Sequence, residues 1–291
     1  MTDPEKYATR WAPKNYVWEF PMPAKYIWQT DFSNSFSSVD MGFMMSHFDD
    51  FSTSYSFSSP HLNHLAAAEA WGRADALLSM MNGLLYVLHG PKFYPFTLTQ
   101  CIDYVANREI RVEVESIPVM EPFPEDHRDL RYRENPPEYL SPHGKIFFVS
   151  RYDVHIRYLL LMLGRDGLTF PSLYKALDTM KNAGYKEHKL AALRENDPKE
   201  IKKVAQDIND FRFTANKYQG AGLDARHGLE DPVETKARAL SIVEASDIMR
   251  PIVWKFIEKR VSDQFDNLWS SVQYVTGDPQ PGPPLGRGGG S

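Results

Sequence analysis

The spacing of the hydrophobic residues changes at Pro60, and this change limits the folds that are open to the chain. Before Pro60, apolar side chains alternate with other residues, as they do from Val39 to Met45. Alternation of this kind is typical of half-buried β-strands. After Pro60, apolar residues recur at every third or fourth position, which is the spacing of one face of a helix. The sequence therefore predicts an α+β protein: an antiparallel β-sheet region with one long helix, followed by a mainly α-helical C-terminal part.

The long helix is expected over residues 60–89. Ser59 can cap it and Pro60 suits its first turn. Gly90 and Pro91 should end it. Its apolar stripe has spacings of three and four residues and consists of Trp71, Ala74, Leu78, Met81, Leu85 and Leu88. Such a stripe must pack against a sheet, another helix or a second copy of the chain, and the last possibility would make the protein a homo-oligomeric structural protein.

Composition and pattern divide the chain into four segments. Residues 1–120 are predicted to form the aromatic-rich sheet region with its long helix, including a hairpin over 95–119. Proline and charged residues are concentrated in 121–144, which predicts a loop or linker. Residues 145–275 have helical patterns. Residues 276–291 are rich in glycine and proline, which predicts a disordered tail.

The helical part contains four start signals, each of which predicts a helix: Ser150 with Asp153, Pro171, Asp197 with Pro198, and Asp231 with Pro232. Gly164 is expected to end the first of these helices. Pro251 lies inside the last one, which should run toward residue 272. Because proline donates no backbone hydrogen bond, it is expected to kink or split that helix.

The charge balance and the cysteine content disfavour several classes of protein. The net charge of −5 gives no general reason to bind nucleic acid, because a phosphate backbone favours basic surfaces. Cys101 is the only cysteine, so the chain cannot form an intramolecular disulfide. The N-terminus lacks the pattern of a secretory signal, and no apolar run is long enough to cross a bilayer. We therefore expect a soluble, cytoplasmic protein without a membrane partner.

Residues 213–228, FTANKYQGAGLDARHG, are the first candidate site. Glycines allow the backbone to approach a ligand closely, and the cationic side chains could bind a small anionic ligand. The predicted ligand-binding residues are Asn216, Lys217, Asp224, Arg226 and His227. The spacing is not that of a phosphate-binding P-loop, which follows a strand. The alternative interpretation is a solvated connection in which the glycines only make the turn.

Arg151 and His155 are the second candidate pair, because residues four apart on a helix share a face. Together with Arg226 and His227, they are the candidate catalytic residues of an enzyme that acts on a phosphate-containing or nucleic-acid substrate. Helical HEPN ribonucleases separate such an arginine and histidine by four to six residues. Only three residues lie between Arg151 and His155, so HEPN activity is disfavoured. His61 and His64 lack the further ligands that a metal site needs, and no metal and no cofactor are expected.

The string FTAN…ARHG, followed by a proline-started helix, resembles the C-terminal part of uncharacterised bacterial proteins. The order of parts is also similar: an aromatic strand region, a helix with Asn82-Gly83, a hairpin, and helices that include SLYKALD. This resemblance implies a bacterial α+β protein and brings no activity, cofactor or catalytic residue. We therefore expect a recognition or interaction protein that binds a ligand, a protein partner or a second copy of the chain near residues 216–228. A role in defence or regulation would fit such a protein.

Overall fold

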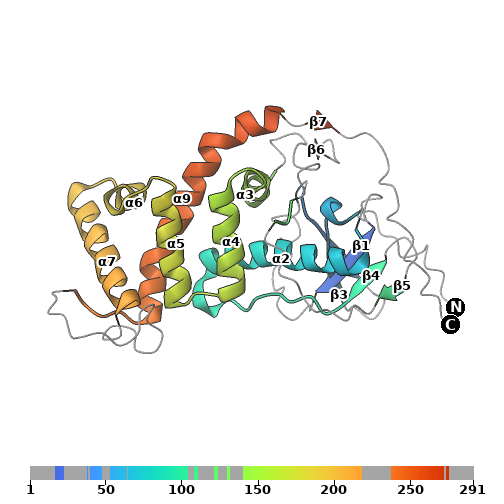
Figure 1. The fold of residues 1–291 in the computed structure, drawn as a ribbon, viewed down its shortest axis with the longest axis horizontal. Helices are drawn as coiled ribbons and strands as arrows, with labels where there is room; N and C mark the ends of the chain where they lie inside the picture. Colours follow the sequence, from blue (N-terminus) through green and yellow to red (C-terminus); the bar gives the residue numbers. More distant parts are fainter. Residues whose placement is uncertain are drawn as a thin grey trace. The chain divides into compact units, whose positions relative to one another are not determined.

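The computed structural model describes a large part of the chain (Figure 1). The described residues are 17–22, 38, 40–47, 53–63, 65–103, 108–110, 121–123, 130–131, 140–217, 237–271 and 273–274. Most of the predicted linker at 121–144 and the predicted tail lie outside them. These two predictions stay predictions.

The predicted fold class is confirmed. Five strands form one antiparallel sheet in the order β2-β3-β1-β4-β5. The strands are β1 (Trp18–Met22), β2 (Gly42–His47), β3 (Thr53–Ser58), β4 (Cys101–Asp103) and β5 (Arg108–Ile110). A long helix, α2 (Ala67–His89), follows the third strand, and the C-terminal part is mainly helical.

Aromatic residues form the buried centre of the sheet. Phe20 on β1 and Phe43 on β2 both lie opposite Phe57 on β3. The ring centroids are 6.2 Å apart for Phe20 and Phe57, and 5.6 Å apart for Phe43 and Phe57. Cross-strand aromatic pairs of this kind stabilise a sheet. The rings of Phe20 and Trp71, near the start of α2, pack edge to face with their centroids 5.9 Å apart.

The long helix begins later than the sequence predicts. Ser59 does act as a cap, but it caps the separate 3-10 turn η3 (Pro60–Leu62), and α2 starts at Ala67. Contacts with the sheet hold the intervening residues out of the helix. The backbone N–H of Val17 donates to Asn63 Oδ1 at 3.1 Å, and Trp18 Nε1 donates to the carbonyl of Leu65 at 3.2 Å. The predicted end is confirmed: the helix stops at His89, before Gly90.

The chain forms two compact units. The first contains residues 1–78, 96–152 and 265–291, and the second contains 79–95 and 153–264. The first unit includes helix α3 (Pro142–Ser150), which Ser141 caps. Phe148 of α3 packs against Trp269 with ring centroids 5.0 Å apart. A short parallel pair joins β6 (Leu130–Arg131) to β7 (Gln273–Tyr274) in the same unit.

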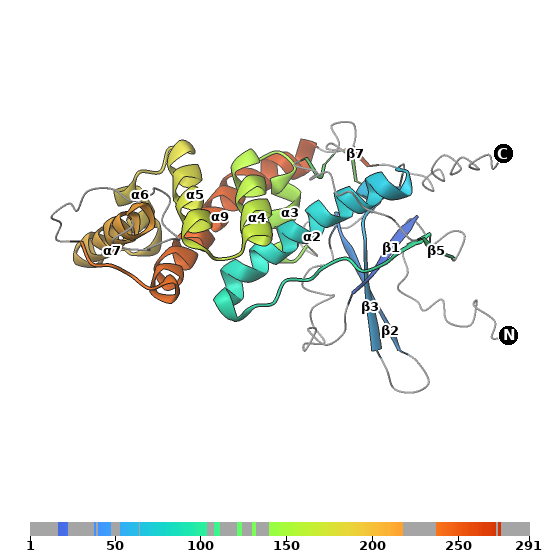
Figure 2. The same cartoon turned by 60° about the horizontal axis from the view of Figure 1, so that its bottom comes forward.

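The second unit is helical. Its helices are α4 (Val154–Asp166), α5 (Phe170–Asn182), α6 (Glu187–Arg194), α7 (Pro198–Asn216) and most of α9 (Ile242–Ser271). Figure 2 shows α4 beside α5, and α6 beside α7, in agreement with the contacts between these pairs. The predicted helix starts at Pro171 and at Asp197-Pro198 are confirmed.

Three helix boundaries differ from the prediction. Ser150 ends α3, and Asp153 alone caps α4. Gly164 does not end α4, which continues to Asp166. A Cβ at Gly164 would overlap the carbonyl oxygen of Ser79, so glycine at this position permits close packing of α4 on α2. Helix α9 begins at Ile242, where Ser241 and Glu244 form a reciprocal cap, and it continues through Pro251 without splitting.

Candidate binding site

Asp153 fixes the start of α4. Its Oδ1 accepts hydrogen bonds from the backbone N–H groups of His155 at 3.0 Å and Ile156 at 3.2 Å. Its Oδ2 accepts hydrogen bonds from Arg260 Nε and Gln264 Nε2, both at 2.6 Å. The side chain of Asp153 is completely buried. A single carboxylate therefore ties the first turn of α4 to α9.

The charge on this carboxylate is stabilised by its partners. Burial alone would raise the pKa of Asp153. Hydrogen bonds from Gln264 and Arg260, together with the charge of Arg260, outweigh burial and hold the pKa below its ordinary value of 3.8. Asp153 is therefore ionised at neutral pH, and the link between α4 and α9 is retained there.

His155 lies beside the same carboxylate. Its ring Nδ1 is 3.6 Å from Asp153 Oδ1, and its side chain is 30% exposed. This distance is longer than a hydrogen bond. The imidazole is therefore close to a buried negative charge and partly open to solvent.

Helix α5 provides a second wall. Thr169 and Ser172 form a reciprocal capping box at its start. Tyr174 packs on Phe211 of α7, with ring centroids 6.4 Å apart, which holds one face of α5 against α7. The hydroxyl of Thr179, on another face, donates to the carbonyl of Lys175 at 2.8 Å.

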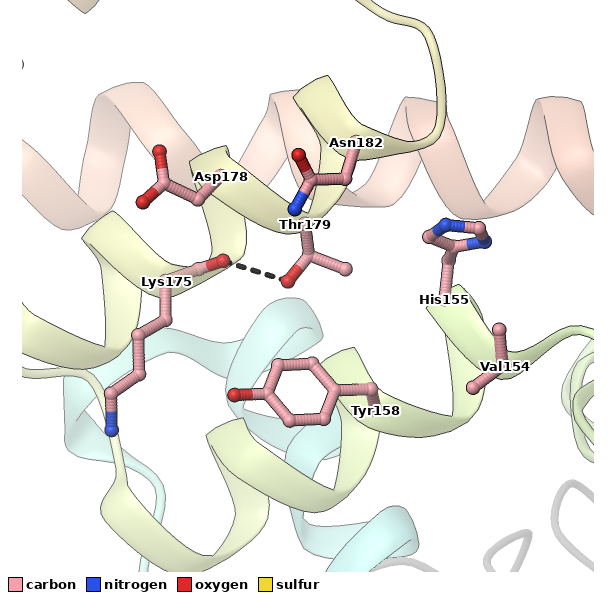
Figure 3. Close-up of a pocket in the computed structure, with 7 residues that line it drawn as sticks. All are labelled: Val154, His155, Tyr158, Lys175, Asp178, Thr179 and Asn182. Atoms are coloured by element: carbon pink, nitrogen blue, oxygen red, sulfur yellow. Dashed lines mark hydrogen bonds between the residues drawn. The ribbon is translucent and has the colours of Figure 1, made fainter.

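The two walls enclose an open pocket of about 460 Å³, which we call the α4–α5 pocket (Figure 3). It is lined by Val154, His155 and Tyr158 from α4, and by Lys175, Asp178, Thr179 and Asn182 from α5. Val154 is 55% exposed and Tyr158 is 37% exposed, so two large apolar side chains lie at the surface here. In Figure 3 the side chain of Thr179 lies in the middle of the labelled residues, above the ring of Tyr158.

The charges of the α4–α5 pocket do not favour an anion. The only ammonium among its lining residues is that of Lys175, which lies 3.4 Å from Asp166 Oδ2. This neighbouring carboxylate offsets the positive charge. Asp178, on the same helix as Lys175, is the one carboxylate among the lining residues. An anionic ligand, as predicted for the 216–228 segment, would therefore meet unfavourable charge in this pocket.

The first predicted site is only partly described. Asn216 is the last residue of α7, and Lys217 follows as its C-cap. Asp224, Arg226 and His227 lie outside the described residues. The convergence of the five predicted ligand-binding side chains therefore stays a prediction.

The second predicted pair does not share a helix face. The chain leaves α3 at Arg151, where backbone N–H groups make tight turns to Phe148 and Val149, and α4 starts only after Asp153. Arg151 is completely buried in the first unit, and its Nε donates to Asp40 Oδ1 at 2.6 Å. His155, in contrast, lines the α4–α5 pocket of the second unit.

His61 completes a buried group with Asp40 and Arg151, which we call the Asp40 cluster. The Nε2 of His61 lies 2.8 Å from the same Asp40 oxygen, and all three side chains are completely buried. Burial would raise the pKa of Asp40, but the charge of Arg151 and the hydrogen bond from His61 outweigh it and lower the pKa. The cluster joins the segment just before β2, the 3-10 turn after β3 and the end of α3, so its evident role is architectural.

Sequence reasoning missed most of the α4–α5 pocket. It named His155 but not Tyr158, Asp178 or Asn182. The sequence did contain one signal of this pocket. Val154 and Tyr158 are four residues apart, so these two large apolar residues share one face of α4, and that face is exposed.

Comparisons with protein-family models, curated proteins and solved structures found no match to the chain. Within the described part of the chain, no group of three or more His, Cys, Asp or Glu side chains could hold a metal ion. None of the described helices is long and apolar enough to cross a membrane. The geometry of the α4–α5 pocket therefore carries the functional interpretation.

Proposed function

We propose that this chain is a recognition protein that binds its ligand or partner in the α4–α5 pocket. The observation that carries the proposal is the pocket's lining: two exposed apolar side chains are surrounded by an imidazole, an amide and charges of both signs. Binding sites typically combine apolar contact area with a few placed polar groups, and tyrosine is common at their centres. The volume of about 460 Å³ suits a small molecule or a few side chains of a partner.

Both walls are held in place before anything binds. Asp153 joins the start of α4 to Arg260 and Gln264. The capping box fixes the start of α5, and Tyr174 packs it on α7. A preformed site loses less conformational entropy on binding, which raises affinity.

The geometry supports binding better than catalysis. A general base must lie within hydrogen-bond reach of the group that orients it or of its substrate. His155 is 3.6 Å from Asp153, beyond that reach, and the Thr179 hydroxyl is bonded to a backbone carbonyl rather than to a base. An enzyme that uses His155 is therefore the second candidate, because the histidine does line a pocket beside a carboxylate.

The other sequence-based proposals fare differently. We retain the segment 216–228 as a proposed second contact region. We also retain a bacterial role in defence or regulation, which the resemblance suggests. The stripe of α2 gives no support to a homo-oligomer, because four of its residues are buried within the chain itself: Ala74, Leu78, Met81 and Leu85.

Filling the pocket tests the proposal. Asn182 is exposed, so Asn182→Trp should block the pocket without disturbing the core. Lys189→Trp, at an exposed position on α6 that does not line the pocket, is the matched control. Native mass spectrometry of each protein, purified from its own host, should show a bound species in the wild type and the control but not in Asn182→Trp. Equal retention by all three would contradict the proposal.

A further inference from the structure

We infer that the α4–α5 pocket binds an uncharged, flat aromatic ring that carries hydrogen-bond donors and acceptors at its edge. This is the chemistry of a nucleobase, presented as a free base or as a nucleoside. The inference rests on the proposed function above and specifies its ligand class. It follows from three features of the pocket: its charged side chains are engaged, its open polar groups are neutral, and an aromatic ring is exposed in it.

The two oppositely charged side chains of the lining are engaged within the protein. The ammonium of Lys175 lies 3.4 Å from Asp166 Oδ2. Asp178 also has an interaction of its own, and Figure 3 shows its carboxylate pointing away from the ring of Tyr158. A charged ligand would therefore lose water without meeting an unengaged counter-charge on either side chain, which costs free energy. An uncharged ligand avoids this cost.

Three other polar groups of the lining are open to a ligand: the hydroxyl of Tyr158, the amide of Asn182 and the Nε2 of His155. Within the part of the chain that the structure describes, none of these three groups makes a hydrogen bond. A tyrosine hydroxyl, a carboxamide and a neutral imidazole each both donate and accept hydrogen bonds. The ligand edge that matches them carries donors and acceptors together, as the edge of a nucleobase does.

The exposed ring of Tyr158 provides a stacking surface. Tyr158 is 37% exposed, and Figure 3 shows the flat of its ring, below Thr179. The hydroxyl of Thr179 donates to the carbonyl of Lys175 at 2.8 Å, and its methyl group lies on the side of His155. The ring and the methyl group therefore present apolar surface beside an imidazole. Every nucleobase has a face that can stack on an aromatic side chain in this way.

Size and charge assign the ring to a small molecule. The pocket volume of about 460 Å³ is within the range of small-molecule sites. The net charge of −5 gives no general reason to bind a polynucleotide. A free base or a nucleoside therefore fits the pocket better than a base within a nucleic acid.

Isothermal titration of the full chain with four probes tests the inference. The probes are adenosine, uridine, adenosine 5′-monophosphate and ribose. At least one of the two nucleosides should bind. Ribose should not bind, because it lacks the aromatic ring. The monophosphate should bind no more tightly than adenosine, because the ammonium of Lys175 already lies beside a carboxylate.

Substitutions on the two walls make the test sharp. Tyr158→Leu should weaken nucleoside binding about tenfold, because it removes the stacking surface, whereas Tyr158→Phe keeps the ring and should weaken binding by no more than about threefold. Asn182→Leu should weaken binding about threefold, because it removes the amide. Asn209→Leu, at an exposed position on α7 that does not line the pocket, is the matched control and should leave binding unchanged. All three positions are exposed, so folded variants are expected, and far-ultraviolet circular dichroism checks them.

Three results would overturn the inference: neither nucleoside binds, ribose binds as tightly as the nucleosides, or the monophosphate binds more tightly than adenosine. Nucleoside binding that Tyr158→Leu leaves unchanged would also overturn it. If a host-derived species is nevertheless lost from Asn182→Trp, the proposed function stands and only the ligand class fails. If Asn182→Trp retains that species, the proposed function itself fails.

Discussion

The Asp40 cluster allows a quantitative test of how the first unit is held together. In Asp40→Asn, the buried guanidinium of Arg151 loses the carboxylate that its Nε contacts at 2.6 Å. An amide nearly matches a carboxylate in shape, so the change removes charge with little change in packing. We expect a large loss in the free energy of unfolding, because a buried charge loses the carboxylate that it contacts.

The magnitude follows from burial. Removing one partner of a buried ion pair costs about 3–5 kcal/mol. Both side chains are completely buried here, so solvent does not reduce this figure. With a shift of about 2–4 °C for each kcal/mol in a chain of this size, the melting temperature should fall by roughly 6–20 °C.

Urea denaturation and amide hydrogen exchange measure the effect. The matched control is Asp247→Asn, because Asp247 is 66% exposed and lies 3.8 Å from Arg250. That pair is expected to contribute no more than about 1 kcal/mol. Exchange in Asp40→Asn should increase around the 3-10 turn η3 and the end of α3, since these segments carry His61 and Arg151.

A double variant checks the cause. Asp40→Asn with Arg151→Met leaves no unpaired charge, so it should lose clearly less stability than the two single losses added together. Strict additivity, or a loss in Asp40→Asn no larger than in Asp247→Asn, would refute the reasoning.

The same cluster predicts a dependence on pH. The pKa of Asp40 is lower in the folded protein than its ordinary value of 3.8, so its contribution is complete above that pH and is lost as the pH falls through the lowered pKa. The difference in stability between wild type and Asp40→Asn should therefore shrink as the pH falls below about 4. A difference that grows on acidification would contradict this sign.

Three further predictions concern other parts of the fold. Burial, together with the nearby charge of Asp103, raises the pKa of Cys101 to about 12. The thiol should therefore resist a disulfide reagent at pH 8 until the protein unfolds, and rapid labelling of the native protein would contradict this. Gly164→Ala should lower the free energy of unfolding by about 1–3 kcal/mol, despite the higher helix propensity of alanine, because its Cβ overlaps a carbonyl of α2; unchanged or raised stability in urea would contradict the close packing. Arg260→Met should cost about 1–3 kcal/mol and weaken ligand binding, because the buried Asp153 loses the charge of Arg260 but keeps the hydrogen bond from Gln264; full affinity would show that the Asp153 link does not shape the pocket.

The helical and strand content could be predicted from local pattern. Period-two alternation before Pro60 predicted strands there, as β2 confirms, and four of the six stripe residues of α2 are buried, as their spacing predicts. The start of α7 at Asp197-Pro198 could also be predicted locally, because the capping residue and the first turn of the helix are adjacent in sequence. These features depend on neighbouring residues alone.

Features that depend on distant contacts were not predictable. Gly164 has the local signature of a helix end, but the requirement that keeps it inside α4 comes from Ser79 on α2. Ser59 caps a 3-10 turn rather than α2, because Val17 and Trp18 bind the residues that follow it. No local pattern contains these partners.

The candidate site shows the same division. His155 was named from its own spacing, whereas the α4–α5 pocket depends on the placement of α5 beside α4. Arg151 and His155 do not share a helix because Asp153, which lies between them, caps the start of α4 with its own carboxylate.

The most direct test of the central claim is hydrogen–deuterium exchange of the wild-type protein with and without the species it retains from its host. The pocket claim predicts new protection in peptides that cover residues 154–158 and 175–182. Protection confined to peptides of the 216–228 segment, with no change in α4 or α5, would contradict it.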